Sequence, residues 1–204
     1  MTLTPEQLEV LARAIHPSRV AKRSQSGREL SYLESWDVRA HLIRLFGYGN
    51  FDIETLDQHL VGVREYFTKG DDPKPMAEAI WFAKVRLTIR DTDGYRVCRF
   101  TESAIGGTAG PASMISEHHD NAIKTAASDA LKRCAINLGN QFGLSLYRNG
   151  SLADVVRQTV VPVQPEPDLS PEQIKTLQDS LGAEIVPVED VELPPVAPPE
   201  EARA

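Results

Sequence analysis

The spacing of apolar residues predicts two helices in the first fifty residues. Thr4-Pro5-Glu6-Gln7 has the form of a capping box with proline at the first helical position, which predicts a helix through about Ile15. Apolar residues three or four apart predict a second helix from about Ser35 to Phe46, ended by the Gly47-Tyr48-Gly49 segment. Between these helices, residues 16–31 are basic and polar, and we expect a flexible connection there.

The middle of the chain is typical of strands. Residues 51–67, 77–90 and 95–103 are rich in β-formers, and the last two segments are joined by Asp93-Gly94, a strong hairpin signal. This pattern predicts an antiparallel meander of three or four strands. Residues 104–116 are small and uncharged, and we expect a mobile loop there.

A long helix is predicted from about Glu117 to Leu138. Its apolar side is made mostly of alanines, so it must lie close against a sheet or another helix: Ile123, Ala126, Ala127, Ala130, Leu131, Cys134 and Leu138. Its polar side carries the adjacent cations Lys132 and Arg133: Asn121, Thr125, Asp129, Lys132, Arg133, Asn137 and Asn140. Such a rod can hold charge along a phosphate backbone, or its cations can simply favour the helix dipole. The predicted fold class is α+β, a β-meander packed against a long helix.

Composition divides the chain into two parts. The net charge of −7 is unevenly spread, because residues 1–160 hold 20 Lys and Arg against 19 Asp and Glu, whereas residues 161–204 hold 2 against 10. Residues 10–28 carry five cations and no acid, a pattern that suits phosphates. We expect one folded domain over 1–158 and an acidic, proline-rich, disordered tail over 159–204, with a short helix at about 170–182.

Several classes of protein are disfavoured by the sequence. Cys98 and Cys134 give neither a disulfide framework nor a metal-ligand spacing. We expect no signal peptide, no membrane span and a cytoplasmic location, which is the host cytoplasm if the protein is viral. The segment 106–110 is glycine-rich but lacks the lysine of a nucleotide-binding loop, so we expect no nucleotide hydrolysis. We also expect no cofactor and no enzymatic activity.

Four sequence features occur together in an informative order. Leu30-Ser-Tyr-Leu-Glu34 precedes a helix, Phe46-Gly-Tyr-Gly-Asn-Phe51 follows it, the hairpin meander comes next, and Ala127-Ser-Asp-Ala-Leu-Lys-Arg-Cys-Ala-Ile-Asn-Leu-Gly-Asn140 ends the long helix. In this order they resemble the DNA-binding half of the Rad52 family of single-strand annealing proteins. The resemblance covers roughly residues 18–147 and is to a compact viral or bacterial member.

The resemblance implies a fold, an assembly and a set of DNA-binding residues. It implies subunits joined side by side in a closed ring, with single-stranded DNA in a basic groove, its backbone inward and its bases exposed. Lys132 and Arg133 match the paired cations of the long helix, and Arg23 and Tyr32 match a groove arginine and tyrosine. Tyr32 can stack on a base or sugar, or serve as a core aromatic. A further cation of the family is replaced here by Ile136. Around the predicted helix, this residue lies between Lys132 and Arg133 on the polar face.

Other basic residues are weaker candidates for DNA contact. Lys22, Arg19 or Arg28 can compensate for the missing charge, and Lys69 and Lys74 can form a second, outer DNA site. The expected function is annealing of complementary strands in homologous recombination and repair, with single-stranded DNA and further copies of the chain as partners. The tail is a candidate for recruiting a single-strand-binding protein or an exonuclease, competing with DNA, or only solubilising the protein.

Three alternatives remain open from the residues. One is a single-strand-protecting or mediator protein without annealing activity, which would use the same cations. Another is a metal-dependent nuclease built on His118-His119-Asp120 with Glu117, although neighbouring helical residues diverge by about 100° and solvated histidines are the commoner outcome. The third is a scaffold ring that binds no nucleic acid.

Overall fold

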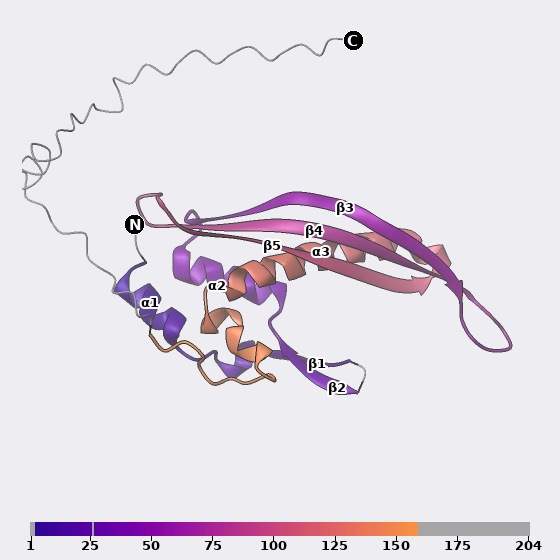
Figure 1. The fold of residues 1–204 in the computed structure, drawn as a ribbon, viewed down its shortest axis with the longest axis horizontal. Coiled ribbons are helices and arrows are strands. Elements are labelled where there is room, and N and C mark those ends of the chain that lie inside the picture. Colours follow the sequence, from indigo (N-terminus) through magenta and orange to yellow (C-terminus); the bar gives the residue numbers. More distant parts are fainter. Residues whose placement is uncertain (1–2, 26, 159–204) are drawn as a thin grey trace, which may run out of the picture. The chain divides into compact units, whose positions relative to one another are not determined.

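The computed structural model describes residues 3–25 and 27–158. Its regular elements, in chain order, are α1 (Pro5–Ala12), β1 (Ala21–Gln25), β2 (Arg28–Tyr32), α2 (Ser35–Phe46), β3 (Phe51–Phe67), β4 (Pro75–Arg90), β5 (Arg96–Pro111) and α3 (Ile115–Ile136). Short 3₁₀ turns are η1 (Pro17–Arg19), η2 (Ala112–Met114), η3 (Asn140–Phe142) and η4 (Leu144–Tyr147). The predicted α+β class, an antiparallel meander against a long helix, is confirmed (Figure 1).

The helix α3 covers one face of the β3-β4-β5 sheet (Figure 1). The side chains of β4 that face α3 alternate along the strand and are buried: Ala77, Ala79, Ala83, Val85, Leu87 and Ile89. The side of α3 that faces the sheet carries Ala122, Ala126 and Ala130, which are fully buried. Small side chains on both surfaces allow α3 to lie close to the sheet, as its alanine-rich face predicted.

The expectation of a mobile loop at 104–116 is wrong, because β5 continues to Pro111 and η2 leads directly into α3. The small residues serve close packing rather than flexibility. A Cβ on Gly106 would lie 2.4 Å from the Ala122 carbonyl oxygen and 2.5 Å from the Ala126 amide nitrogen. A Cβ on Gly110 would lie 2.6 Å from Cε1 of His118. Glycine is therefore required at both of these close approaches between the strand and the helix.

The expectation of a flexible connection over 16–31 is also wrong. The chain forms η1 and then the antiparallel hairpin β1–β2, in which Ala21 pairs with Tyr32 and Arg23 with Leu30. The hairpin lacks the apolar alternation that marks a half-buried strand, since most of β1 is polar and exposed. The first helix also ends at Ala12, earlier than the predicted end at about Ile15, which is nevertheless buried.

The end of α3 differs from the prediction at Asn140. This residue was assigned to the polar helix face, but the helix ends at Ile136 and Gly139 turns the chain with a φ of 102°. Asn140 is fully buried, and its amide nitrogen donates to the carbonyls of Ala12 (2.8 Å) and Val156 (2.6 Å). Its oxygen accepts from the amides of Val155 and Val156. One side chain thus ties three chain segments together.

Asn140→Ala is expected to lower the free energy of unfolding by about 3 kcal/mol, because it leaves buried backbone donors and acceptors without partners. Urea unfolding followed by circular dichroism measures the change. Asn121→Ala, at an exposed position of α3, is the matched control and should change stability little. Equal stability of the two variants would contradict a stabilising role for the hydrogen bonds of Asn140.

No helix within residues 3–25 and 27–158 is long and apolar enough to cross a bilayer. The predicted acidic tail and its short helix at about 170–182 lie outside the described residues.

Candidate nucleic-acid interface

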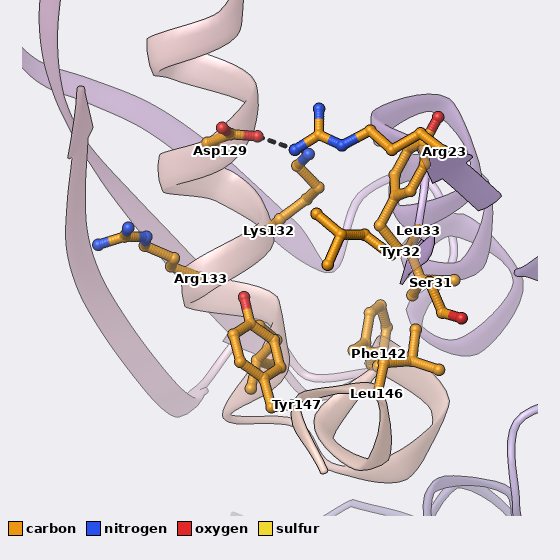
Figure 2. A pocket seen from close by; sticks show the side chains of 13 residues that line it. Arg23, Ser31, Tyr32, Leu33, Asp129, Lys132, Arg133, Phe142, Leu146 and Tyr147 are labelled. Atoms are coloured by element: carbon orange, nitrogen blue, oxygen red, sulfur yellow. Dashed lines mark ion pairs between the residues drawn. The ribbon is translucent and has the colours of Figure 1, made fainter. Parts of the chain in front are cut away.

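A groove of about 350 Å³ lies between the β1–β2 hairpin, the last turns of α3 and the turns η3 and η4 (Figure 2). Four predicted site residues line it: Arg23, Tyr32, Lys132 and Arg133. They come from segments about a hundred residues apart in sequence. The structure therefore brings them into one place, and their contact with DNA stays a prediction.

Lys132 and Arg133 diverge from one anchored turn of α3. The buried residues Leu131, Cys134 and Ala135 hold this turn against the core. Lys132 points toward the hairpin, with its Nζ 2.5 Å from Oδ1 of Asp129. Arg133 points toward β5, where its guanidinium donates to the Ser103 carbonyl at 3.1 Å. Consecutive helical residues differ by about 100°, so the two side chains diverge although both line the groove.

Tyr32 lies close to two cations. Arg23 is two residues from Ala21, the partner of Tyr32 in the hairpin, so Arg23 and Tyr32 share one face of it. The guanidinium carbon of Arg23 lies 5.3 Å from the Tyr32 ring centroid, and Nζ of Lys132 lies 6.0 Å from it. Both distances fall within the range of cation–π attraction. The half-buried ring thus holds two positive charges near the mouth of the groove.

The floor of the groove is apolar. It is lined by Ile136, Leu33, Phe142 and Leu146. This agrees with the predicted position of Ile136 on the helix face that carries Lys132 and Arg133. Among the described lining residues, the cations Arg23, Lys132 and Arg133 face one carboxylate, Asp129. The groove consequently combines a basic rim with a surface that suits a sugar or a base.

Other predicted cations lie away from this groove. Lys22 is on the opposite face of the hairpin from Arg23, and its Nζ is 2.8 Å from Oε1 of Glu29. Arg28 begins β2. Lys69 and Lys74 lie in the connection between β3 and β4, outside the residues that line the groove, and their role in an outer site stays a prediction.

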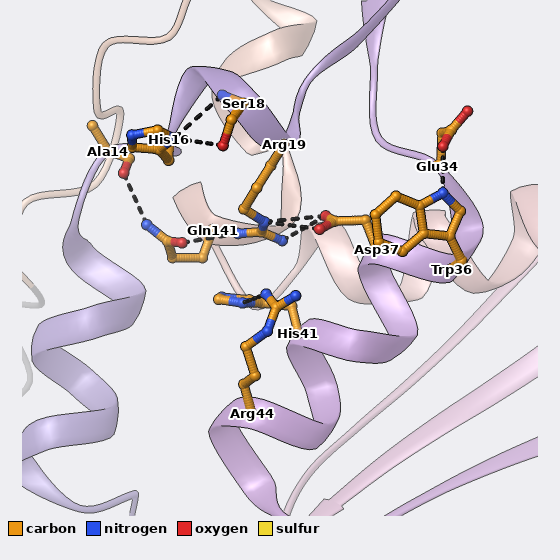
Figure 3. Close-up of polar contacts among 10 residues, drawn as sticks. All are labelled: Ala14, His16, Ser18, Arg19, Glu34, Trp36, Asp37, His41, Arg44 and Gln141. Atoms are coloured by element: carbon orange, nitrogen blue, oxygen red, sulfur yellow. Dashed lines mark hydrogen bonds and ion pairs between the residues drawn. The ribbon is translucent and has the colours of Figure 1, made fainter.

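Arg19 has a structural role, so it does not compensate for the charge replaced by Ile136. Its guanidinium binds both carboxylate oxygens of Asp37, at 2.8–3.1 Å, and donates to the Gln141 amide oxygen at 3.0 Å (Figure 3). The side chains of Arg19 and Asp37 are only 12% and 3% exposed. This buried pair fastens η1 to α2 and to η3 below the groove.

His41 extends this network toward the groove. Burial, reinforced by Arg19 and Arg44 and opposed by Asp37, lowers the pKa of His41 to about 4, so the ring is neutral at pH 7. Because a guanidinium only donates, Nδ1 of His41 accepts from Arg44 at 3.2 Å (Figure 3). The ring packs edge-on against Phe142, with centroids 5.1 Å apart. The network thereby supports the groove floor.

The histidines proposed for a nuclease site hold the start of α3 in place. His118 is buried, 5% exposed, with Nε2 3.0 Å from the Pro111 carbonyl oxygen, so the expectation of a solvated histidine is wrong. His119 accepts at Nδ1 from the Trp81 indole at 2.8 Å, and Asp120 pairs with Lys124. Among the described residues, no three His, Cys, Asp or Glu side chains are grouped to hold a metal ion. The neighbours of both rings favour a packing role.

Sequence reasoning missed Tyr147 and most of the groove floor. Tyr147 lines the groove from η4 and is 74% exposed. Its only sequence signal is an aromatic residue shortly after the glycine-rich end of the long helix. Leu33, Phe142 and Leu146 read as ordinary core residues, and only the fold shows that they meet at the groove.

Comparison with known proteins covers nearly all of the residues that the structure describes. Comparison with curated proteins gives no match. A family model described as "Rad52/22 family double-strand break repair protein" matches residues 5–163. The match extends from α1 through the meander, α3 and the turns that close the groove. The chain belongs to the Rad52/22 family of double-strand break repair proteins.

Proposed function

We propose that this protein binds single-stranded DNA and anneals complementary strands during recombination and repair, without nucleotide hydrolysis. The observation that carries the proposal is the convergence of Arg23, Lys132 and Arg133 around Tyr32 in one groove. The family membership supports a role in DNA repair, and the cluster of cations in the groove supports the proposed contact with DNA.

The rim of the groove suits the DNA backbone. Flexible, exposed cations neutralise phosphates, and such contacts position a strand without reading its sequence. The Watson–Crick edges then remain free, so a second strand is selected by base pairing. Binding of this kind weakens steeply with salt, with a log–log slope of roughly −0.7 per neutralised phosphate.

Self-association would multiply this modest site. In the described part of the chain, β3 and β5 are the outer strands of the sheet, and β3 is long and mostly exposed. Exposed apolar side chains follow β3: Leu56, Leu60, Val61, Val63 and Phe67. An outer strand of this kind offers unpaired backbone groups to a neighbour. We propose a ring of subunits joined through these strands, in which several weak grooves bind one strand with avidity.

An annealing assay tests the proposed function. Two complementary oligonucleotides, one carrying a fluorophore and the other a quencher, are mixed with the protein in the presence of a metal chelator and without nucleotide. We expect duplex formation above the spontaneous rate, because the protein concentrates both strands while leaving their bases free. Tight binding of each strand with no acceleration would favour the protective or mediator function, and loss of intact strands would indicate a nuclease.

A further inference from the structure

Tyr147 extends the groove beyond the cations. Its ring lines the groove described above and also an adjoining shallow hollow of about 440 Å³ that includes Glu102 and Asn137. Arg133 and Ile136 line both spaces. Figure 2 shows the Tyr147 ring over the last turns of α3, with Arg133 to one side and Phe142 and Leu146 to the other, whereas Tyr32 lies at the hairpin. An aromatic ring therefore lies near each end of the basic surface.

The backbone that carries Tyr147 is firmly anchored. Its neighbours Ser145 and Leu146 are buried, and the Gly150 amide donates to the Leu146 carbonyl at 2.8 Å. Gly143, with a φ of 88°, begins the turn in a left-handed conformation that suits glycine. A Cβ there would also lie 3.3 Å from Cδ1 of Leu33. The exposed ring is thus presented from a fixed position, which reduces the entropy lost on binding.

The surroundings of the ring suit an unpaired nucleotide. A phosphate held by Arg133 would place its sugar and base next to the Tyr147 ring and the Ile136 side chain. Every base has a π face, so stacking on an aromatic ring tolerates any sequence. In a duplex, both faces of an internal base are already covered by its neighbours. A stacking contact at this position would consequently be available to a single strand and withheld from a duplex.

We propose that Tyr147 stacks on an unpaired base of the bound strand and gives the groove its preference for single-stranded over double-stranded DNA. This inference rests on the proposed function. The residues of the site then have different roles. Arg23, Lys132 and Arg133 supply affinity for phosphate, whereas Tyr147 supplies selectivity for an unstacked base.

The test compares Tyr147→Ala, Tyr147→Phe and the control Tyr95→Ala, which removes a 58% exposed tyrosine between β4 and β5. Short thymidine oligonucleotides, abasic oligonucleotides of equal length and duplexes are titrated by fluorescence anisotropy over a range of salt. Tyr147→Ala should weaken binding of the thymidine strand by about tenfold, the range of one stacked base. It should leave abasic-strand binding, duplex binding and the salt slope unchanged. Tyr147→Phe and Tyr95→Ala should resemble the wild type.

The other possible results distinguish failure of this inference from failure of the proposed function. Equal binding of the thymidine strand by Tyr147→Ala and wild type overturns the inference and leaves the proposed function standing. An equal loss on the thymidine and abasic strands also overturns it, since the effect then does not pass through a base. Quenching of 2-aminopurine in the strand, expected with wild type and Tyr147→Phe, gives a readout that does not depend on the alanine variant folding. Failure of the wild type to bind any single strand overturns the proposed function itself.

Discussion

Lys132→Ala combined with Arg133→Ala is expected to weaken single-stranded DNA binding by about hundredfold at moderate salt. Each cation can make a charge-assisted contact with a phosphate worth about 1.5 kcal/mol, and two such contacts together correspond to roughly two decades of affinity. The log–log salt slope should become shallower by about 1.4, which is roughly 0.7 for each phosphate that is no longer neutralised. Fluorescence anisotropy at several salt concentrations measures both quantities.

Folding and assembly should survive this double substitution. Both side chains lie at the solvent-facing side of α3, and alanine favours the helix. Lys124→Ala is the control, because Lys124 is an exposed lysine on the same helix, is paired with a nearby aspartate as Lys132 is, and lies outside the groove. If the double variant binds like the wild type, the groove is not the DNA site.

Gly106→Ala should lower the free energy of unfolding by about 3 kcal/mol, at the upper end of the cost of overpacking a core. The added methyl group would lie 2.4–2.5 Å from backbone atoms of Ala122 and Ala126. Backbone atoms cannot rotate away as a flexible side chain can, so α3 must move away from the sheet. Chemical denaturation monitored by tryptophan fluorescence measures the loss.

Gly107→Ala provides the control from the adjacent residue. Its Cβ would point to the other face of the sheet, where the nearest atoms are Oε1 of Glu78 at 3.6 Å and the Ala79 carbonyl at 4.0 Å. These are ordinary contacts, so we expect a change within about 0.5 kcal/mol. Similar stabilities for the two variants would show that the space between β5 and α3 accommodates a methyl group, contrary to the packing described above.

Local patterns predicted those elements whose sequence signal agrees with their tertiary role. The bounds of α2 follow from apolar residues three or four apart and the glycine stop at Gly47, and β3 follows from its β-rich composition. The second half of β5 could not be predicted in this way. Its glycines indicate flexibility when considered alone, and only the presence of α3 explains why Gly106 and Gly110 must lack side chains.

Some residues of the candidate site could be predicted from the sequence, and others depend on the fold. Arg23, Tyr32, Lys132 and Arg133 were found through family resemblance, and the fold brings them together. Arg19 was a reasonable candidate by charge, but its burial against Asp37 depends on a contact between η1 and α2 that no local pattern reveals. Tyr147 was missed for the converse reason, because its exposure at the groove depends on how η4 folds back beside α3.

The most direct test of the central claim is annealing of complementary strands coated with a single-strand-binding protein, with metal chelated and no nucleotide present. The wild type and the Lys132→Ala, Arg133→Ala double variant are compared at equal concentration. We predict that the wild type accelerates annealing above the spontaneous rate and that the double variant does not. Failure of the wild type to accelerate annealing, or equal acceleration by both proteins, would contradict annealing through this groove.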